Sequence, residues 1–200
     1  MARNVFAPWA EIVPDVGPMT ADDLLKLPDD GWRYELVYGV LVRMAPTHFE
    51  HASLVHRLDR TLGNYVDPRG LGQVLAGDPG FVLSQAGKPD LVLAPDIAFV
   101  AAARIPSTGA SGSTGFPRLA PDLAIEVASP SQYKPEMNDK AKAYLDTGVR
   151  LVWVVWNDTQ TVDVWRLGSD APAATLAMGG ALDGLDVIPG FSYALAELFG

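Results

Sequence analysis

Two carboxylates and one lysine are the residues in this sequence most suited to chemistry. Asp96 stands at the entry to the apolar stretch 97–100, and Glu126 lies inside the apolar stretch 123–127. A carboxylate inside a strand is costly to bury unless a metal ion or a lysine pairs with it. Glu126 therefore needs a partner, and Lys140 on the next predicted helix is one possibility, although taken alone it would be an ordinary helix-surface lysine.

These residue types suit the hydrolysis of a phosphodiester bond. Two carboxylates on neighbouring strands can hold a hard cation such as Mg²⁺ through oxygen ligands, with water in the remaining positions. A lysine beside such an ion can orient or deprotonate the attacking water, while the metal stabilises charge on a phosphoryl oxygen. Glu35 is a fourth candidate, although its alternation with Tyr34 and Leu36 also fits a solvent-exposed strand residue.

The predicted elements would place these residues in one cleft. Residues 121–127 read as a buried strand, residues 138–147 have helical spacing, and residues 151–156 form a second apolar strand. Residues 32–44 resemble a hairpin, and residues 48–66 carry the longest helical pattern. Hairpins and buried strands mixed with helices predict an α/β fold, a mixed β-sheet core flanked by helices. Further strands are predicted near 72–75, 80–83, 91–93, 97–100, 161–167, 173–178 and 181–187, before a last helix capped by Ser192.

The length of 200 residues fits one domain, predicted as residues 19–200 after an N-terminal arm, residues 1–18. No apolar run approaches the ~18 residues that span a bilayer, and the first residues do not resemble a signal peptide. We therefore expect a cytoplasmic protein with no membrane partner. The absence of cysteine excludes disulfides and thiolate metal sites.

The charge balance argues against an extended nucleic-acid surface. The chain has 15 Lys and Arg against 24 Asp and Glu, for a net charge of -9. Contacts to phosphates need clustered basic residues. A divalent metal in the site or local basic patches could compensate for the acidic balance.

The order and spacing of these motifs resemble the PD-(D/E)XK nuclease superfamily and, more narrowly, the Uma-two (Uma2) family of proposed restriction endonucleases. The resemblance runs from about Met19 to the last predicted helix. It is carried by Tyr34–Leu41, His51, Ala94–Ile97, Pro121–Pro130, Asp139-Lys140 with Tyr144, Gly148-Val149 and Trp153.

The resemblance implies a restriction-endonuclease-like fold that cleaves DNA with Mg²⁺, for which Mn²⁺ could substitute. It implies that Asp96 and Glu126 are metal ligands, joined by the backbone carbonyl of Val127. Glu35 would match the acidic residue from the first part of the core. Since nucleases of this kind often bring two sites to two strands, we also expect a homodimer.

One position departs from the superfamily pattern. Ala128 stands two residues after Glu126, where the basic pattern has lysine. The Uma2 family is similar in placing its lysine on the following helix, which indicates Lys140. Lys142 lies about 200° further around that helix and should face away from the site.

Several alternatives stay open at this point. His51 could bind phosphate or position Glu35, and Asp122 could either contact the site or end a loop. The chain could be a catalytically inactive nuclease-fold module for protein or DNA binding, which the acidic charge and Ala128 favour. It could also be a metal-dependent hydrolase of another phosphodiester.

Overall fold

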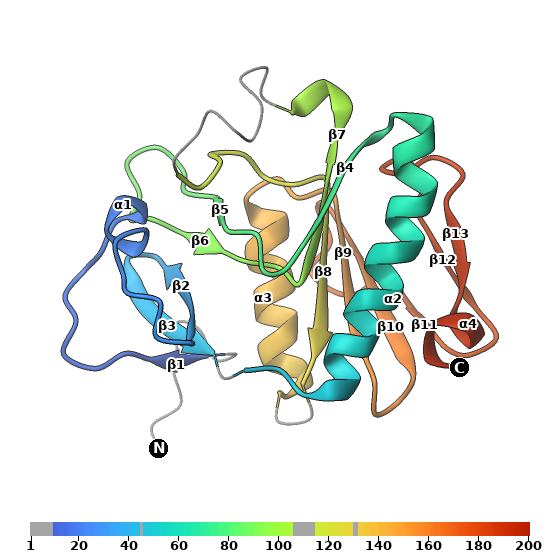
Figure 1. The fold of residues 1–200 in the computed structure, drawn as a ribbon, viewed down its shortest axis with the longest axis horizontal. Coiled ribbons are helices and arrows are strands. Elements are labelled where there is room, and N and C mark those ends of the chain that lie inside the picture. Colours follow the sequence, from blue (N-terminus) through green and yellow to red (C-terminus); the bar gives the residue numbers. More distant parts are fainter. Residues whose placement is uncertain (1–9, 45, 106–114, 130–131) are drawn as a thin grey trace.

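Two β-sheets lie on opposite sides of helix α3 (Lys134–Asp146), as Figure 1 shows. The computed structural model describes residues 10–44, 46–105, 115–129 and 132–200. Apolar side chains from both sheets and from α3 form one shared core, in which Leu93, Tyr144 and Val154 are buried. Helix α3 is therefore enclosed between the sheets.

The larger sheet has six strands in the order β11-β10-β9-β8-β7-β4. Strands β8 and β9 are parallel and every other neighbouring pair is antiparallel, so the sheet is mixed, as predicted. Parallel neighbours require a crossover, and α3 supplies it. The strands are β4 (Gly72–Ala76), β7 (Ile97–Ala101), β8 (Leu123–Ala128), β9 (Leu151–Trp156), β10 (Thr161–Arg166) and β11 (Ala174–Leu176).

The smaller sheet has five antiparallel strands in the order β1-β3-β2-β6-β5. Its central hairpin turns at Tyr38 and Gly39, whose φ angles of 51° and 81° suit a tight two-residue turn. Helix α1 (Ala21–Leu24) packs on this sheet through the core that includes Leu36. The strands are β1 (Glu11–Ile12), β2 (Arg33–Val37), β3 (Val40–Met44), β5 (Phe81–Val82) and β6 (Val92–Leu93).

The other face of the six-stranded sheet is covered by C-terminal elements and by α2 (Phe49–Val66). Successive strand residues point to opposite faces. On β8, Ile125 and Val127 therefore pack in the α2 core, whereas Ala124 and Ala128 pack in the α3 core. The remaining elements are the β12 (Ala181–Asp183) and β13 (Ser192–Ala194) pair, α4 (Leu195–Phe199) and the 3₁₀ turns η1 (Asp67–Arg69) and η2 (Ala102–Arg104).

Three sequence predictions need correction. The structure has two large sheets rather than one central sheet. Ser192 does not cap the last helix; it begins β13, and Ala194 is the N-cap of α4. Helix α3 begins at Lys134, four residues before the predicted start at Asn138. Long-range pairing with β12 draws Ser192 into β13, whereas α3 starts where local signals place it, with a proline in its first turn and a capping box between Tyr133 and Glu136.

The described part of the predicted N-terminal arm is attached to the smaller sheet. Glu11 pairs with Arg43 and Ile12 with Val42 in the strand register, and Arg43 also binds the Glu11 carboxylate at 3.2 Å. Residues 1–9 of the arm lie outside the described residues. Among the described helices, none is long and apolar enough to cross a membrane.

Candidate active site

Lys140 connects acidic residues from the two sheets. Its Nζ lies 2.9 Å from Glu126 Oε1 on β8 and 3.1 Å from Glu35 Oε1 on β2. The side chains of Lys140 and Glu35 are 2% and 0% exposed, so both charges are buried. A buried charge needs close partners of opposite sign, and this triad supplies them.

Tyr144 adds a neutral donor to the same carboxylate. It stands one helical turn after Lys140, so both side chains leave the same face of α3. Its hydroxyl donates a hydrogen bond of 2.7 Å to Glu126 Oε1. Glu126 is thus held from α3 by a cation and by a hydroxyl.

Asp96 lies where the chain passes from one sheet to the other. Residues 94–96 connect β6 of the smaller sheet with β7 of the larger one. The Ala94 N–H donates to Glu35 Oε1 at 2.9 Å, which ties the start of this connection to the triad. Ile97 then pairs with Ile125, and the same antiparallel register extended by one residue places Asp96 opposite Glu126. Glu126 faces α3, whereas Asp96 precedes β7 and is contacted from the α2 side by His51.

Asp96 is bound by two groups from the α2 side and from β8. His51 Nε2 lies 3.0 Å from Asp96 Oδ1, and the Val127 N–H donates to Asp96 Oδ2 at 2.7 Å. The carboxylate accepts, so we assign the proton of His51 to Nε2. His51 Nδ1 is buried and has no hydrogen-bond partner.

Arg33 and Asp78 are two further charged residues at this site that sequence reasoning missed. Arg33 stands two residues before Glu35 on β2, hence on the same strand face. Its guanidinium binds the Asp78 carboxylate and lies 3.5 Å from Asp96 Oδ1. The spacing of Arg33 and Glu35 could have indicated the arginine, whereas nothing in the sequence marks Asp78 within its turn.

The surroundings keep Lys140 protonated and make Glu126 harder to ionise. Burial would lower the pKa of Lys140, but Glu126 and Glu35 raise it above its ordinary value. Burial raises the pKa of Glu126 to about 7; Lys140 opposes this shift, whereas Asp96 and Glu35 add to it. These contacts favour the ammonium form of Lys140 at neutral pH.

The pKa values of Asp96 and Tyr144 shift in opposite directions. Burial would raise the pKa of Asp96, but its contacts with His51 and the Val127 N–H outweigh burial and lower the pKa. Burial, followed by the neighbouring Glu126, raises the pKa of Tyr144 well above its ordinary value. Asp96 is therefore a carboxylate and Tyr144 a hydroxyl donor throughout the physiological pH range.

The donor set fits a hard divalent cation. Four carboxylates meet here (Glu35, Asp78, Asp96 and Glu126) against the two permanent cations Arg33 and Lys140. Burial raises the pKa of Glu126, and the neighbouring Asp96 and Glu35 add to that rise. Within the described ranges, no three His, Asp or Glu side chains are grouped to hold an ion together. Mg²⁺ is usually bound through one or two carboxylates with water in its other positions, so two of these carboxylates could suffice.

Asp122 lies away from this constellation. It precedes β8 at the strand end opposite Glu126 and is bound by Arg104 at 2.9 Å, Arg150 at 3.4 Å and the Ala101 N–H at 2.9 Å. It is a buried structural carboxylate and does not join the triad.

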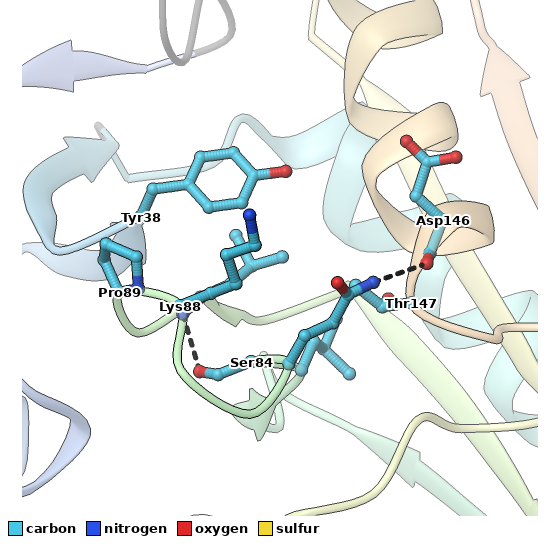
Figure 2. Close-up of a pocket in the computed structure, with 9 residues that line it drawn as sticks. Tyr38, Ser84, Lys88, Pro89, Asp146 and Thr147 are labelled. Atoms are coloured by element: carbon cyan, nitrogen blue, oxygen red, sulfur yellow. Dashed lines mark hydrogen bonds between the residues drawn. The ribbon is translucent and has the colours of Figure 1, made fainter.

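A pocket of about 570 Å³ opens at the carboxyl end of α3, lined by Tyr38, Ser84, Lys88 and Asp146 among others. Figure 2 shows Lys88 extending toward the Tyr38 ring, with Asp146 on the opposite wall. None of the predicted site residues lines it. The buried triad of Lys140, Glu126 and Glu35 and this pocket are therefore two separate sites.

Comparison with known families decides the affiliation of the chain. A model of the family Uma2, described as "Putative restriction endonuclease", matches residues 21–196. The chain belongs to the Uma2 family. That description supports a nuclease, an enzyme that hydrolyses nucleic acid, for this Uma2 member. No match was found among curated proteins.

The fold of this Uma2 chain also resembles a crystal structure. That protein, from Anabaena variabilis ATCC 29413, is described as "a putative nuclease belonging to DUF820". The two share 22% sequence identity with a TM-score of 0.75, over 91% of this chain and 98% of the other. The predicted restriction-endonuclease-like fold is therefore confirmed.

Proposed function

We propose that this chain is a Mg²⁺-dependent endonuclease that hydrolyses DNA phosphodiester bonds. The observation that carries the proposal is the buried array in which Lys140 Nζ contacts Glu126 at 2.9 Å and Glu35 at 3.1 Å, beside Asp96. An amine and several carboxylates brought together between the two sheets would serve phosphoryl transfer, where charge builds up on phosphoryl oxygens. The family description supports the nucleic-acid substrate.

Asp96 and Glu126 would hold Mg²⁺, with Mn²⁺ as a substitute, and the Val127 carbonyl would be the main-chain ligand. When bound, the metal supplies Lewis-acid stabilisation of phosphoryl charge and lowers the pKa of a coordinated water. The Val127 N–H already binds Asp96, so β8 and Asp96 are held in register before metal arrives.

The chain's own residues have complementary roles in this proposal. Lys140, held as an ammonium, orients the attacking water and stabilises charge on the phosphate instead of removing a proton. Glu35 fixes the Lys140 amine from the other sheet. His51 holds Asp96 from α2, which makes it a positioning residue.

Plasmid cleavage tests the proposal. Supercoiled DNA is incubated with Mg²⁺ or Mn²⁺ and wild type, Glu126→Gln, Lys140→Met or Lys142→Ala, the last a matched lysine on the same helix. We expect nicking by wild type and Lys142→Ala, and a loss of about 10²–10³-fold in the other two variants. Equal nicking by Glu126→Gln and wild type would refute the assigned site.

Two outcomes would replace the nuclease by one of its rivals. Metal binding without cleavage of any DNA would identify a catalytically inactive module. Turnover of bis-p-nitrophenyl phosphate without DNA cleavage would identify a hydrolase of another phosphodiester. The expected homodimer is a separate proposal, tested by sedimentation equilibrium with and without DNA.

A further inference from the structure

Two aromatic side chains project into solvent at the helix ends nearest the site. Phe49, the first residue of α2, is 83% exposed, and Tyr133, the residue before α3, is 65% exposed. Among the described residues they are the two most exposed large apolar side chains. Exposing a phenylalanine ring this fully leaves apolar area in water that burial would otherwise stabilise.

Both residues stand at the start of a helix, and both helices begin at the carboxyl end of β8, where Glu126 and Val127 are. Helices α2 and α3 cover opposite faces of the larger sheet, and both begin at this end of the strand (Figure 1). Phe49 stands two residues before His51, which binds Asp96 at 3.0 Å. Phe49 therefore shares the first turn of α2 with His51, while its exposed ring leaves the helix about 200° around from the buried His51 side chain.

Tyr133 is placed at the same end by its neighbour. Lys134 Nζ lies 5.8 Å from the centre of the Trp156 ring, and Trp156 pairs with Ala128, the last residue of β8. Lys140 follows Tyr133 by two helical turns, about 10 Å. The two exposed rings thus flank the strand end from opposite faces of the sheet.

Basic side chains around this end are paired with carboxylates. The guanidinium of Arg33 is bound by Asp78, and Lys134 Nζ lies 3.5 Å from Asp163 Oδ2. The net charge of -9 repels a polyanion as a whole. Stacking on aromatic rings is a way to hold nucleic acid that needs no positive charge, because every base has an aromatic face.

We propose that Phe49 and Tyr133 form a stacking platform for unpaired bases of DNA, so that the substrate class is single-stranded DNA or DNA with unpaired bases at the cleavage point. The inference rests on the proposed nuclease function, since it names the substrate of the same site. A base stacked on either ring would lie at the end of the larger sheet where β8 carries Glu126. Paired bases within a duplex offer no free faces to the rings.

The test separates binding from cleavage. Binding of a fluorescent oligothymidine and of an equally long duplex is measured by anisotropy in a Glu126→Gln background, which is impaired in cleavage if the nuclease proposal holds. The added variants are Phe49→Ala, Phe49→Leu, Phe49→Trp and Tyr133→Ala. Leu167→Ala is the matched control, because Leu167 is 54% exposed but follows Arg166, which pairs with Leu151 at the opposite end of the sheet.

We expect tighter binding to the single strand than to the duplex. Phe49→Ala and Tyr133→Ala should each weaken single-strand binding about five- to a hundredfold, the range for loss of one stacked base. Phe49→Leu should weaken it similarly because it keeps apolar area but loses the ring, whereas Phe49→Trp and Leu167→Ala should bind as the background does.

Single-strand binding that is unchanged in Phe49→Ala and Tyr133→Ala would overturn the platform. Plasmid cleavage by wild type in that case would leave the nuclease proposal intact. If binding depends on the rings but wild type cleaves no DNA, the stacking platform would be supported and the nuclease proposal would be refuted. The two proposals therefore fail separately.

Discussion

The amine of Lys140 lies 3.1 Å from the Glu35 carboxylate, although one residue belongs to a helix on the larger sheet and the other to a strand of the smaller sheet. With Glu126 at 2.9 Å from the same amine, three buried charges connect the two halves of the fold. Their arrangement leads to predictions about stability as well as activity.

Removing the central cation should destabilise the fold. Lys140→Met leaves Glu126 and Glu35 buried without their shared partner, and breaking a buried ion pair from one side costs about 3–5 kcal/mol. The double variant Lys140→Met with Glu35→Gln should recover part of this loss, because one of the two orphaned charges is gone. Urea unfolding of the single and double variants measures the coupling. If Lys140→Met lowers the free energy of unfolding equally with and without Glu35→Gln, the predicted coupling between the two residues is wrong.

The Tyr144 hydroxyl should contribute to stability through its bond to Glu126. Tyr144→Phe keeps the ring and removes one buried donor, so we expect a loss of about 1–3 kcal/mol in the free energy of unfolding. Tyr65→Phe is the matched control, since the Tyr65 hydroxyl donates to the Pro189 carbonyl in an exposed setting. Equal losses in the two variants would show that burial of the Glu126 contact adds nothing.

Without metal, the free energy of unfolding should fall as the pH rises through the pKa of Glu126. Its folded pKa of about 7 lies above the ordinary value of 4.5, because burial and the nearby Asp96 and Glu35 disfavour its charge. The folded state therefore binds more protons than the unfolded state between these values, and raising the pH there favours unfolding by on the order of a few kcal/mol. Thermal melts in chelator from pH 4.5 to 8, compared with Glu126→Gln, measure it. The melting temperature of Glu126→Gln should change less with pH than that of wild type. Identical changes in the two proteins would show that Glu126 is not the group responsible.

Mg²⁺ should stabilise the protein and weaken this dependence on pH. An ion that binds only the folded state adds about 2.7 kcal/mol at a hundred times its Kd. The rise in melting temperature should disappear in Asp96→Asn and Glu126→Gln. Asp163→Asn is the control, because Asp163 is a fully buried carboxylate on β10 that accepts a hydrogen bond from Trp156 at 2.8 Å, outside the triad. A Mg²⁺ response that survives in Asp96→Asn would contradict the ligand assignment.

Local patterns in the sequence determined much of what surrounds the site. The apolar stretches around Ile97, Ile125 and Trp153 predicted three neighbouring strands of the larger sheet, and these are β7, β8 and β9. The four-residue spacing of Lys140 and Tyr144 placed both on one face of a helix, and both contact Glu126. Such inferences succeed because side-chain direction repeats every two residues in a strand and every 3.6 in a helix.

Only the tertiary structure decided what meets across the two sheets. Glu35 was equally compatible with a solvent-exposed strand residue, yet its strand joins a second sheet that packs on α3 and buries it completely. Arg33 and Asp78 meet through the same packing. Local sequence patterns do not specify which distant strands pair, and the protonation of Lys140 and Glu126 depends on that pairing, because pKa values follow burial and the charges nearby.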